Sequence, residues 1–152
     1  MRRMLLRARA RRRTDRGAAA VEFALVLLPL IVIVFGIIDY GFMLSFRQQV
    51  SQAADEGARA GAVEIDSTKQ LTDASAAVNS AMSALKVSGS TVQCGDGRLT
   101  CTVTKGACAN DSSHQCITVK LDYAYSANPV IPTMPLVPMP GHLIYTAVAR
   151  VN

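Results

Sequence analysis

One carboxylate stands inside a long apolar run near the N-terminus. Residues 18–38 contain a single charged side chain, that of Glu22. A helix over these residues would be about 30 Å long, which is the thickness of the hydrocarbon core of a bilayer. A charge placed in lipid is costly, so Glu22 is a candidate functional residue. The alternative is that Glu22 lies shallowly in the interfacial region and has no such role.

Glu22 could form an ion pair if a peptidase cut the chain after Gly17. The new ammonium group of Ala18 would then lie four residues before Glu22, on the same face of the helix. The two charges would compensate one another in low dielectric, within one chain or between adjacent chains. Such a pair could set the register between packed helices, and it would become available only after cutting.

The rest of the chain offers no recognised catalytic motif. It has no glycine-rich phosphate loop, no H-E-x-x-H and no G-x-S-x-G, and the two histidines, His114 and His142, stand outside any motif. We therefore expect a protein that is not an enzyme and that uses no cofactor and no metal. A tethered enzyme assembled around one of the histidines is the weakest alternative.

Four cysteines lie close together in a stretch rich in turn residues: Cys94, Cys101, Cys108 and Cys116. An even number in an exported segment predicts two disulfides. Three pairings are possible, and we favour the sequential one because it closes two short loops. A zinc site is the competing interpretation, but the C-x6-C and C-x7-C spacings are wider than those of usual structural zinc pairs.

The positive charge of the chain is concentrated in residues 1–17, which hold eight arginines and one aspartate, a net charge of +7. The remaining residues carry a net charge of −2. This asymmetry predicts a cytoplasmic leader, with everything after Asp39 across the membrane. Nucleic-acid binding is not expected, because no aromatic residues are interleaved with the arginines. The apolar run is longer than that of a secretory signal and lacks a following cleavage site, which favours a retained anchor.

The elements that position Glu22 are predicted to be a transmembrane helix over residues 18–38, kinked at Pro29, and its helical continuation over residues 39–62. Apolar and small residues recur there every three or four positions: Phe42, Phe46, Val50, Ala53 and Gly57. The small residues between Ala53 and Ala62 would let another helix approach closely. That helix could belong to the protein's own head or to a neighbouring copy, and the sequence leaves both open.

Residues 63–152 are predicted to form an extracytoplasmic α+β head. A second helix is expected from Ser67, its N-cap, to Leu85, with an apolar stripe made of Leu71, Ala74, Val78, Ala81, Met82 and Leu85. Alternating residues predict antiparallel strands around residues 99–104, 117–125 and 144–148, separated by turns at residues 95–97 and 110–113. The proline-rich segment 128–141 is expected either to be a contact surface or to fold over the core of the head, and we favour the second.

The segment Gly17-Ala18-Ala19-Ala20-Val21-Glu22-Phe23 resembles the processing site of Tad/Flp-type prepilins and pseudopilins, in which a prepilin peptidase cuts after the glycine and a Glu–aromatic pair follows. The continuation resembles TadE-like pilus assembly proteins. The matching stretches are residues 16–17, 22–25, 29, 35–41, 53–62 and 147–151. The similarity is strong over residues 16–62 and loose over the head.

This resemblance implies a bacterial inner-membrane pseudopilin, or minor pilin, with a cytoplasmic N-terminus, a single span and a head in the periplasm. It would act in assembly or priming of an adhesive pilus or become a minor part of it. By position, Gly17 and Ala18 flank the cut, and Glu22 with Phe23 supports processing and assembly. The implied partners are a prepilin peptidase, other pilins and pseudopilins, and the inner-membrane assembly platform. The alternative function is that of a membrane-tethered extracytoplasmic ligand-binding domain.

Overall fold

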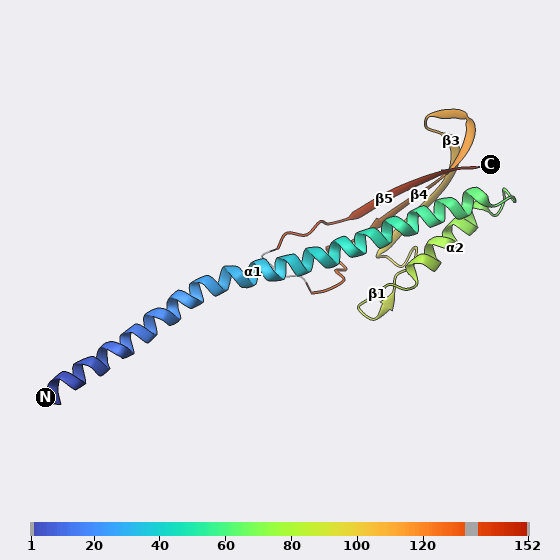
Figure 1. Cartoon of the computed structure of the whole chain (residues 1–152). Helices are drawn as coiled ribbons and strands as arrows, with labels where there is room; N and C mark the ends of the chain where they lie inside the picture. Colours follow the sequence, from blue (N-terminus) through green and yellow to red (C-terminus); the bar gives the residue numbers. More distant parts are fainter. Residues whose placement is uncertain (1, 133–136, 152) are drawn as a thin grey trace. The chain divides into compact units, whose positions relative to one another are not determined.

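The computed structural model describes residues 2–132 and 137–151, with side chains described from Gly17 onward. Its elements are α1 (Arg2–Val63), α2 (Gln70–Met82), β1 (Lys86–Val87), β2 (Ser90–Thr91), β3 (Leu99–Cys108), β4 (Asp111–Tyr123) and β5 (Leu143–Arg150) (Figure 1). The chain divides into two units, Met1–Ile38 and Asp39–Asn152, and α1 contributes to both. The predicted α+β class, with a long apolar N-terminal helix, is confirmed.

The first unit is helical and presents its apolar side chains outward. From Val21 to Ile38 nearly every large hydrophobic side chain is exposed. The helix is long and apolar enough to cross a membrane, with a mean hydropathy of 2.9 in its most apolar window, and none of that window is buried. Pro29 lies inside the helix, where its ring removes one backbone donor. Such a surface requires lipid or another protein to cover it.

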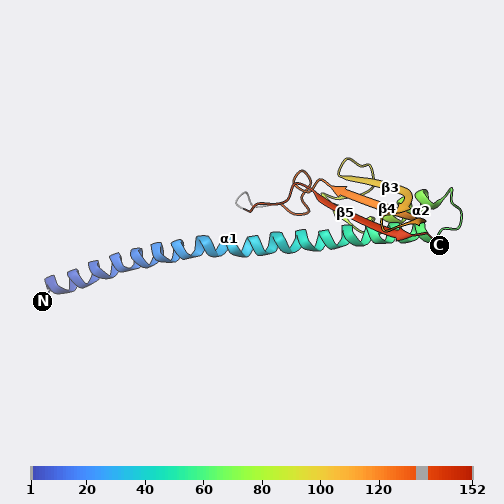
Figure 2. The same cartoon turned by 90° about the horizontal axis from the view of Figure 1, so that it is seen from above.

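The second unit is built on a three-stranded antiparallel sheet with the order β3-β4-β5. Figure 2 shows this sheet beside the later part of α1. β4 is the central strand, and Val119 lies opposite Val103 of β3 and Ala147 of β5. Val50 of α1 and Val78 of α2 are fully buried in the same core as Val119. The hydrophobic core of the head therefore includes residues of both helices and of the sheet.

The small-residue face of α1 packs on the protein's own head. A Cβ atom added to Gly57 would lie 2.5 Å from Cγ2 of Val78, and one added to Gly61 would lie 2.8 Å from the carbonyl oxygen of Gln70. Gly57 and Gly61 thus let α1 approach α2 closely, as small residues do at helix contacts. Of the two expectations for this face, packing on the head is correct, and residues 39–63 belong structurally with the head.

The second helix begins later than predicted, at Gln70, and Ser67 is not its N-cap. Lys69 occupies that position and makes no side-chain capping bond. A turn held by Asp66 comes before the helix: its carboxylate accepts hydrogen bonds from the Thr68 N–H at 3.0 Å and the Thr68 hydroxyl at 2.6 Å. The local bonds of Asp66 compete with helix formation and delay the start of α2.

Two apolar faces differ from the prediction. In α2, which ends at Met82 and not at Leu85, the buried stripe contains Ala74, Val78 and Met82, whereas Leu71 and Ala81 are exposed. In β5 the alternation is the reverse of the prediction. Ile144 and Val148 face solvent, whereas Leu143 and Ala147, the residues directly before them, are buried. Because both faces of β5 carry apolar residues, its pairing with β4 decides which face is buried, and the sequence pattern does not.

The hairpin between β3 and β4 is longer than predicted. β4 already begins at Asp111, so most of the stretch 110–113 that was assigned to a turn belongs to a strand, with a register shift between Ala107 and Cys108. A short hairpin of β1 and β2 was not predicted. Its connection contains Ser88 at φ 52° and Gly89 at φ 82°, both in the left-handed region that two-residue hairpin turns require.

The proline-rich segment folds over the core of the head in its described part. Val130 and Met139 pack against the core, and the hydroxyl of Tyr123 donates a hydrogen bond to the carbonyl of Asn128 at 2.7 Å. These contacts agree with the favoured of the two expectations. Residues 133–136 of the predicted loop lie outside the described residues.

Candidate functional site

The predicted processing segment lies in α1 and is exposed. Gly17, Ala18 and Glu22 are exposed, and the side chain of Phe23 is 67% exposed. A Cβ atom added to Gly17 would meet no other atom within 4 Å. The side chains of this segment are therefore open to contact with a neighbouring helix or another protein.

The bond between Gly17 and Ala18 lies within the helix, so a peptidase would need local opening to reach it. Glycine destabilises a helix interior by about 1 kcal/mol relative to alanine, and alanine is the best helix former. Gly17 is followed by three alanines, Ala18 to Ala20. Local helix propensity is thus weakest on the N-terminal side of the predicted cut and strong immediately after it.

The predicted ion pair of Glu22 needs a chemical change that the intact chain does not have. In the intact helix the nitrogen of Ala18 is an amide and carries no charge. Four residues of helix rise correspond to about 6 Å, so an ammonium group at Ala18 would be within reach of the long Glu22 side chain. The arrangement is compatible with pairing after cleavage.

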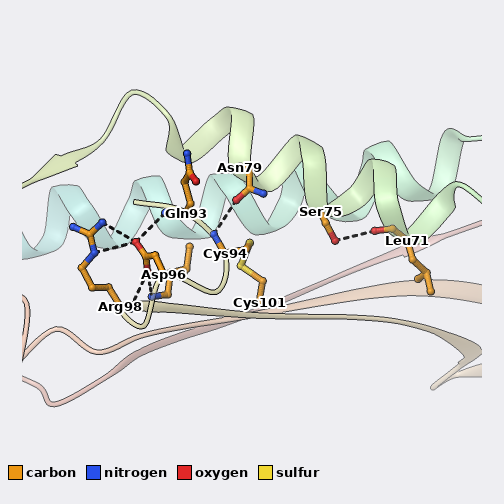
Figure 3. The surroundings of a disulfide bond; sticks show 9 residues. Leu71, Ser75, Asn79, Gln93, Cys94, Asp96, Arg98 and Cys101 are labelled. Carbon is orange, nitrogen blue, oxygen red and sulfur yellow. Dashed lines mark hydrogen bonds and ion pairs between the residues drawn. A yellow bond between two sulfur atoms is a disulfide. The ribbon is translucent and has the colours of Figure 1, made fainter. Parts of the chain in front are cut away.

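The structure contains two disulfides, Cys94–Cys101 and Cys108–Cys116, which is the sequential pairing favoured from the sequence. The first joins the turn before β3 to β3 itself (Figure 3). The backbone N–H of Cys94 also donates to Oδ1 of Asn79 in α2 at 2.8 Å. The disulfide and this hydrogen bond together hold the turn against the second helix.

Asp96 organises the same turn, as Figure 3 shows. Its carboxylate accepts hydrogen bonds from the backbone N–H groups of Gln93, Arg98 and Leu99 and forms an ion pair with the Arg98 guanidinium at 2.7 Å. Burial raises the pKa of Asp96, but the hydrogen bonds together outweigh it, and the pKa lies below its usual value. The carboxylate therefore stabilises the turn in its charged form.

The second disulfide closes the far end of the β3–β4 hairpin, where Cys116 is buried. All four cysteines are oxidised. The interpretation as a zinc site is therefore not supported, since zinc binds thiolates and not disulfides. Within the described residues, no group of three or more His, Cys, Asp or Glu side chains could hold a metal ion.

Both histidines bind a neighbouring aspartate. Nδ1 of His114 lies 2.6 Å from Oδ2 of Asp111 and 2.9 Å from the hydroxyl of Ser113. In a serine hydrolase the acid and the serine bind different ring nitrogens, whereas here both face the same one. Nδ1 of His142 lies 2.7 Å from Oδ1 of Asp122 on the sheet. Neither pair forms a catalytic relay of that kind.

A buried aromatic cluster, which the sequence analysis did not single out, lies where the head begins. The ring of Phe46 is 4.6 Å from that of Tyr123 and 6.1 Å from that of Tyr125, and Asp39 is only 2% exposed. Burial raises the pKa of Tyr123 to about 12. Burial, and then the charge of Asp39, also raise the pKa of Tyr125. The available signal was a carboxylate placed directly after an apolar run.

The head also has an open hollow of about 360 Å³ between α1 and β5, lined by Leu44, Arg47, Gln48, Ser51 and Tyr145. The guanidinium of Arg47 lies over the ring of Tyr145, 5.6 Å from its centroid, and Nε of Arg47 donates to the Tyr145 hydroxyl. The cation is therefore already engaged by an aromatic side chain of the same chain.

Comparison with known proteins identifies the N-terminal part of the chain. The family model described as TadE-like protein matches residues 17–59, which include Gly17, Glu22 and most of the small-residue face. No curated protein and no solved structure matches the chain. The family supports a part in Tad pilus assembly and interaction with other pilus components. The match agrees with the resemblance to TadE-like proteins found in the sequence, and it covers residues 17–59 of the 152-residue chain.

Proposed function

We propose that this protein is a membrane-anchored pseudopilin, or minor pilin, that acts in assembly or priming of a Tad/Flp-type adhesive pilus. In this proposal a prepilin peptidase cuts after Gly17, and the protein carries out no catalysis of its own. The observation that carries the proposal is the exposed Gly17–Phe23 segment at the start of an uncovered apolar helix, within the stretch that matches the TadE-like family.

The two parts of α1 differ in which surface they leave free for contacts with other proteins. The small-residue face of residues 53–62 is buried against the head, so it is not free to bind neighbouring copies. The apolar residues from Val21 to Ile38 are exposed and form the remaining helix surface for association. In this proposal the anchor makes the contacts with other pilins. Its apolar side chains pack against neighbouring helices, and Glu22 forms an ion pair.

Two independent features favour a cytoplasmic N-terminus and a head outside the cytoplasm. The leader carries a net charge of +7, and cytoplasmic flanks of spans are rich in arginine. The head contains two disulfides, which persist in oxidising compartments such as the bacterial periplasm. Removal of the leader would also abolish charge repulsion between the N-termini of packed anchors.

The proposal is tested by the mass of the N-terminal peptide in membranes of cells with and without an active prepilin peptidase. We expect an N-terminus at Ala18 only when the peptidase is active. Met1 at the N-terminus in both strains, together with normal pili, would contradict processing.

Glu22→Gln keeps the size of the side chain but removes its charge, and it should abolish pilus assembly while membrane insertion persists. Glu56→Gln, on the exposed surface of α1, is the matched control and should assemble normally.

The alternative of a tethered ligand-binding head has one supporting feature, the hollow beside Arg47. It would be favoured over the pseudopilin proposal if a strain lacking this protein made normal pili and if the purified full chain bound a polysaccharide through Arg47.

A further inference from the structure

β5 lies at an edge of the sheet (Figure 2), and in an antiparallel ladder every second residue of such a strand bonds to its neighbour. The N–H of Val151 donates to the carbonyl of Gln115 at 2.8 Å, in the register that pairs β5 with β4. Odd-numbered residues of β5 therefore bond to β4. The even-numbered Ile144, Thr146 and Val148, whose side chains are exposed, direct their N–H and C=O groups away from β4. This free edge can form hydrogen bonds with a further strand.

β3 is the other edge strand, and its edge is protected. The carbonyl of Leu99 accepts a hydrogen bond from the N–H of Gly95 at 2.8 Å, so the preceding turn covers one end of this edge. Farther along, β3 carries Lys105, and its register shifts between Ala107 and Cys108. Charged side chains and bulges of this kind keep other strands away from an edge. The eight residues of β5, all described, contain no lysine or proline and pair with β4 without a register shift.

Two hollows lie beside the free edge of β5. The hollow of about 360 Å³ lies between α1 and Tyr145. A second hollow, of about 260 Å³, is lined by His142 and Ile144 among others, and it shares Arg47 and Tyr145 with the first. No residue of β4 lines either hollow, so both lie on the free side of β5. Because side chains of a strand alternate between two faces, every second side chain of a strand added at β5 would point into these hollows.

Arg47 gives the larger hollow a positive charge. It is the only charged residue among those that line this hollow, and its Nε donates to the hydroxyl of Tyr145. Among the described residues, no carboxylate forms an ion pair with Arg47. The only charged residue of β5 is also a cation, Arg150. An acidic side chain is therefore the complement of this site.

The same charge argues against an occupant from this protein. The leader, residues 1–17, has a net charge of +7. Neither β3 nor β5 contains an acidic residue, so a second copy that paired through either of its edge strands would bring no carboxylate from that strand to Arg47. The partner that fits the charge is a different protein.

We propose that β5 accepts an extended segment of a partner protein as an additional strand, with an acidic side chain of that segment bound to Arg47. The backbone groups of Ile144, Thr146 and Val148 supply the hydrogen bonds, and the hollows select the side chains, as is usual when a peptide adds a strand to a sheet. β-Branched residues on the other face of the segment pack beside Ile144 and Val148. This inference depends neither on cleavage after Gly17 nor on the membrane anchor.

The test uses the detergent-solubilised full chain and a fluorescein-labelled seven-residue peptide, in which threonine or valine alternates with serine and the central residue is aspartate. A second peptide has lysine at its centre. Thr146→Pro removes one N–H from the free edge of β5. Lys105→Pro is the matched control on β3, where the bond between Leu99 and the turn shows that odd-numbered residues face the free edge. Proline is tolerated at such positions because the N–H faces solvent.

We expect fluorescence anisotropy to show binding of the aspartate peptide to the unmodified chain and to Lys105→Pro, and no binding to Thr146→Pro. Arg47→Gln should weaken binding about tenfold, because a charged hydrogen bond is lost. The lysine peptide should bind at least as weakly. Near-ultraviolet dichroism of the tyrosines establishes that each variant is folded. Should Thr146→Pro not fold, hydrogen exchange of the unmodified chain decides, since the aspartate peptide must protect the amides of Ile144, Thr146 and Val148.

Three results would overturn the proposal: no binding of the aspartate peptide to the unmodified chain, equal binding of the lysine peptide, or equal loss of binding in Thr146→Pro and Lys105→Pro. Self-association of the chain without peptide, if Thr146→Pro abolished it, would also overturn the proposal and would assign the edge of β5 to a second copy.

Discussion

The two parts of α1 have the same secondary structure and opposite surroundings. Between Phe23 and Ile38 the helix is apolar on all sides, and nearly all of its large side chains are exposed. Between Asp39 and Val63 it is amphipathic, and the residues of one face are buried against α2 and the sheet, with at most a few per cent of their surface exposed. A helix that is apolar all round is covered by lipid or by other protein, whereas one with a single apolar stripe covers a core. The pattern of hydropathy, and not the helix itself, therefore assigns each part its environment.

The comparison is sharpest for two phenylalanines of the same helix. Phe23 is 67% exposed, whereas Phe46 is 2% exposed and lies against Tyr123 and Tyr125. Burial of an aromatic ring in a packed core contributes several kcal/mol, partly because removing the ring leaves a cavity. The same residue type should thus support folding of the head in one part and only intermolecular packing in the other.

The largest expected effect is that of Phe46→Ala. It should lower the free energy of unfolding of the head by about 3–5 kcal/mol, because it leaves a cavity beside two buried tyrosines. The measurement is urea unfolding of the detergent-solubilised full chain, followed by the near-ultraviolet dichroism of the tyrosines. Phe23→Ala is the matched control and should leave this transition unchanged. An equal loss in both variants would mean that the anchor and the head do not differ as described.

Alanine substitutions of two glycines in α1 should change the stability of the chain by smaller amounts and in opposite directions. Gly61→Ala would place Cβ 2.8 Å from the Gln70 carbonyl oxygen and 3.0 Å from Cβ of Ala74, neither of which can rotate away. Overpacking of this kind costs about 1–3 kcal/mol, which exceeds the gain of about 1 kcal/mol from helix propensity. Gly41→Ala meets no atom within 4 Å and should stabilise the chain slightly. Stabilisation by both substitutions, measured by thermal unfolding, would refute close packing at Gly61.

The sequence predicted those features of the fold that depend on local spacing. The recurrence on α1 of Phe46, Val50, Ala53 and Gly57 correctly marked a packing face, because helical periodicity places them on one side. The prediction was wrong for Phe42, the first residue of the same series, which is 50% exposed. It did not decide what covers that face, since a small-residue stripe fits the protein's own helix and a foreign helix equally well. The position of Gly57 beside Val78 became clear only from the tertiary structure.

Features that depend on pairing between distant residues were not predictable. β5 carries apolar side chains on both faces, so the burial of Leu143 and the exposure of Ile144 follow from the register with β4, where Tyr123 lies opposite Leu143. Asp39 was noted only as the residue after the span. Its burial beside Tyr125 results from a segment more than eighty residues later in the chain.

The candidate processing site was predicted from neighbouring residues alone, and the structure shows only that these residues are exposed on α1. Gly17, Ala18, Glu22 and Phe23 lie within seven positions of one another, and their exposure follows from the lack of any polar stripe in the anchor. Cleavage after Gly17 and the pairing of Glu22 remain predictions, since both depend on molecules other than this chain.

The smallest expected effect is a pH dependence of the stability of the head. The hydrogen bonds of Asp96 lower its pKa below the usual 3.8, so the charged carboxylate stabilises the folded head above that pH, and this stabilisation is lost as the pH falls through the lower, folded value. Asp96→Asn should therefore lower the free energy of unfolding by about 1 kcal/mol at pH 6, a value moderated by partial solvent screening, and the difference should shrink below pH 4. Asp55→Asn, at an exposed position of α1, should change stability little at either pH. A difference for Asp96→Asn that persists at pH 2 would mean that the turn is held by shape and not by charge. The described residues of the anchor are helical and contain no turn of this kind, so this pH dependence should come from the head.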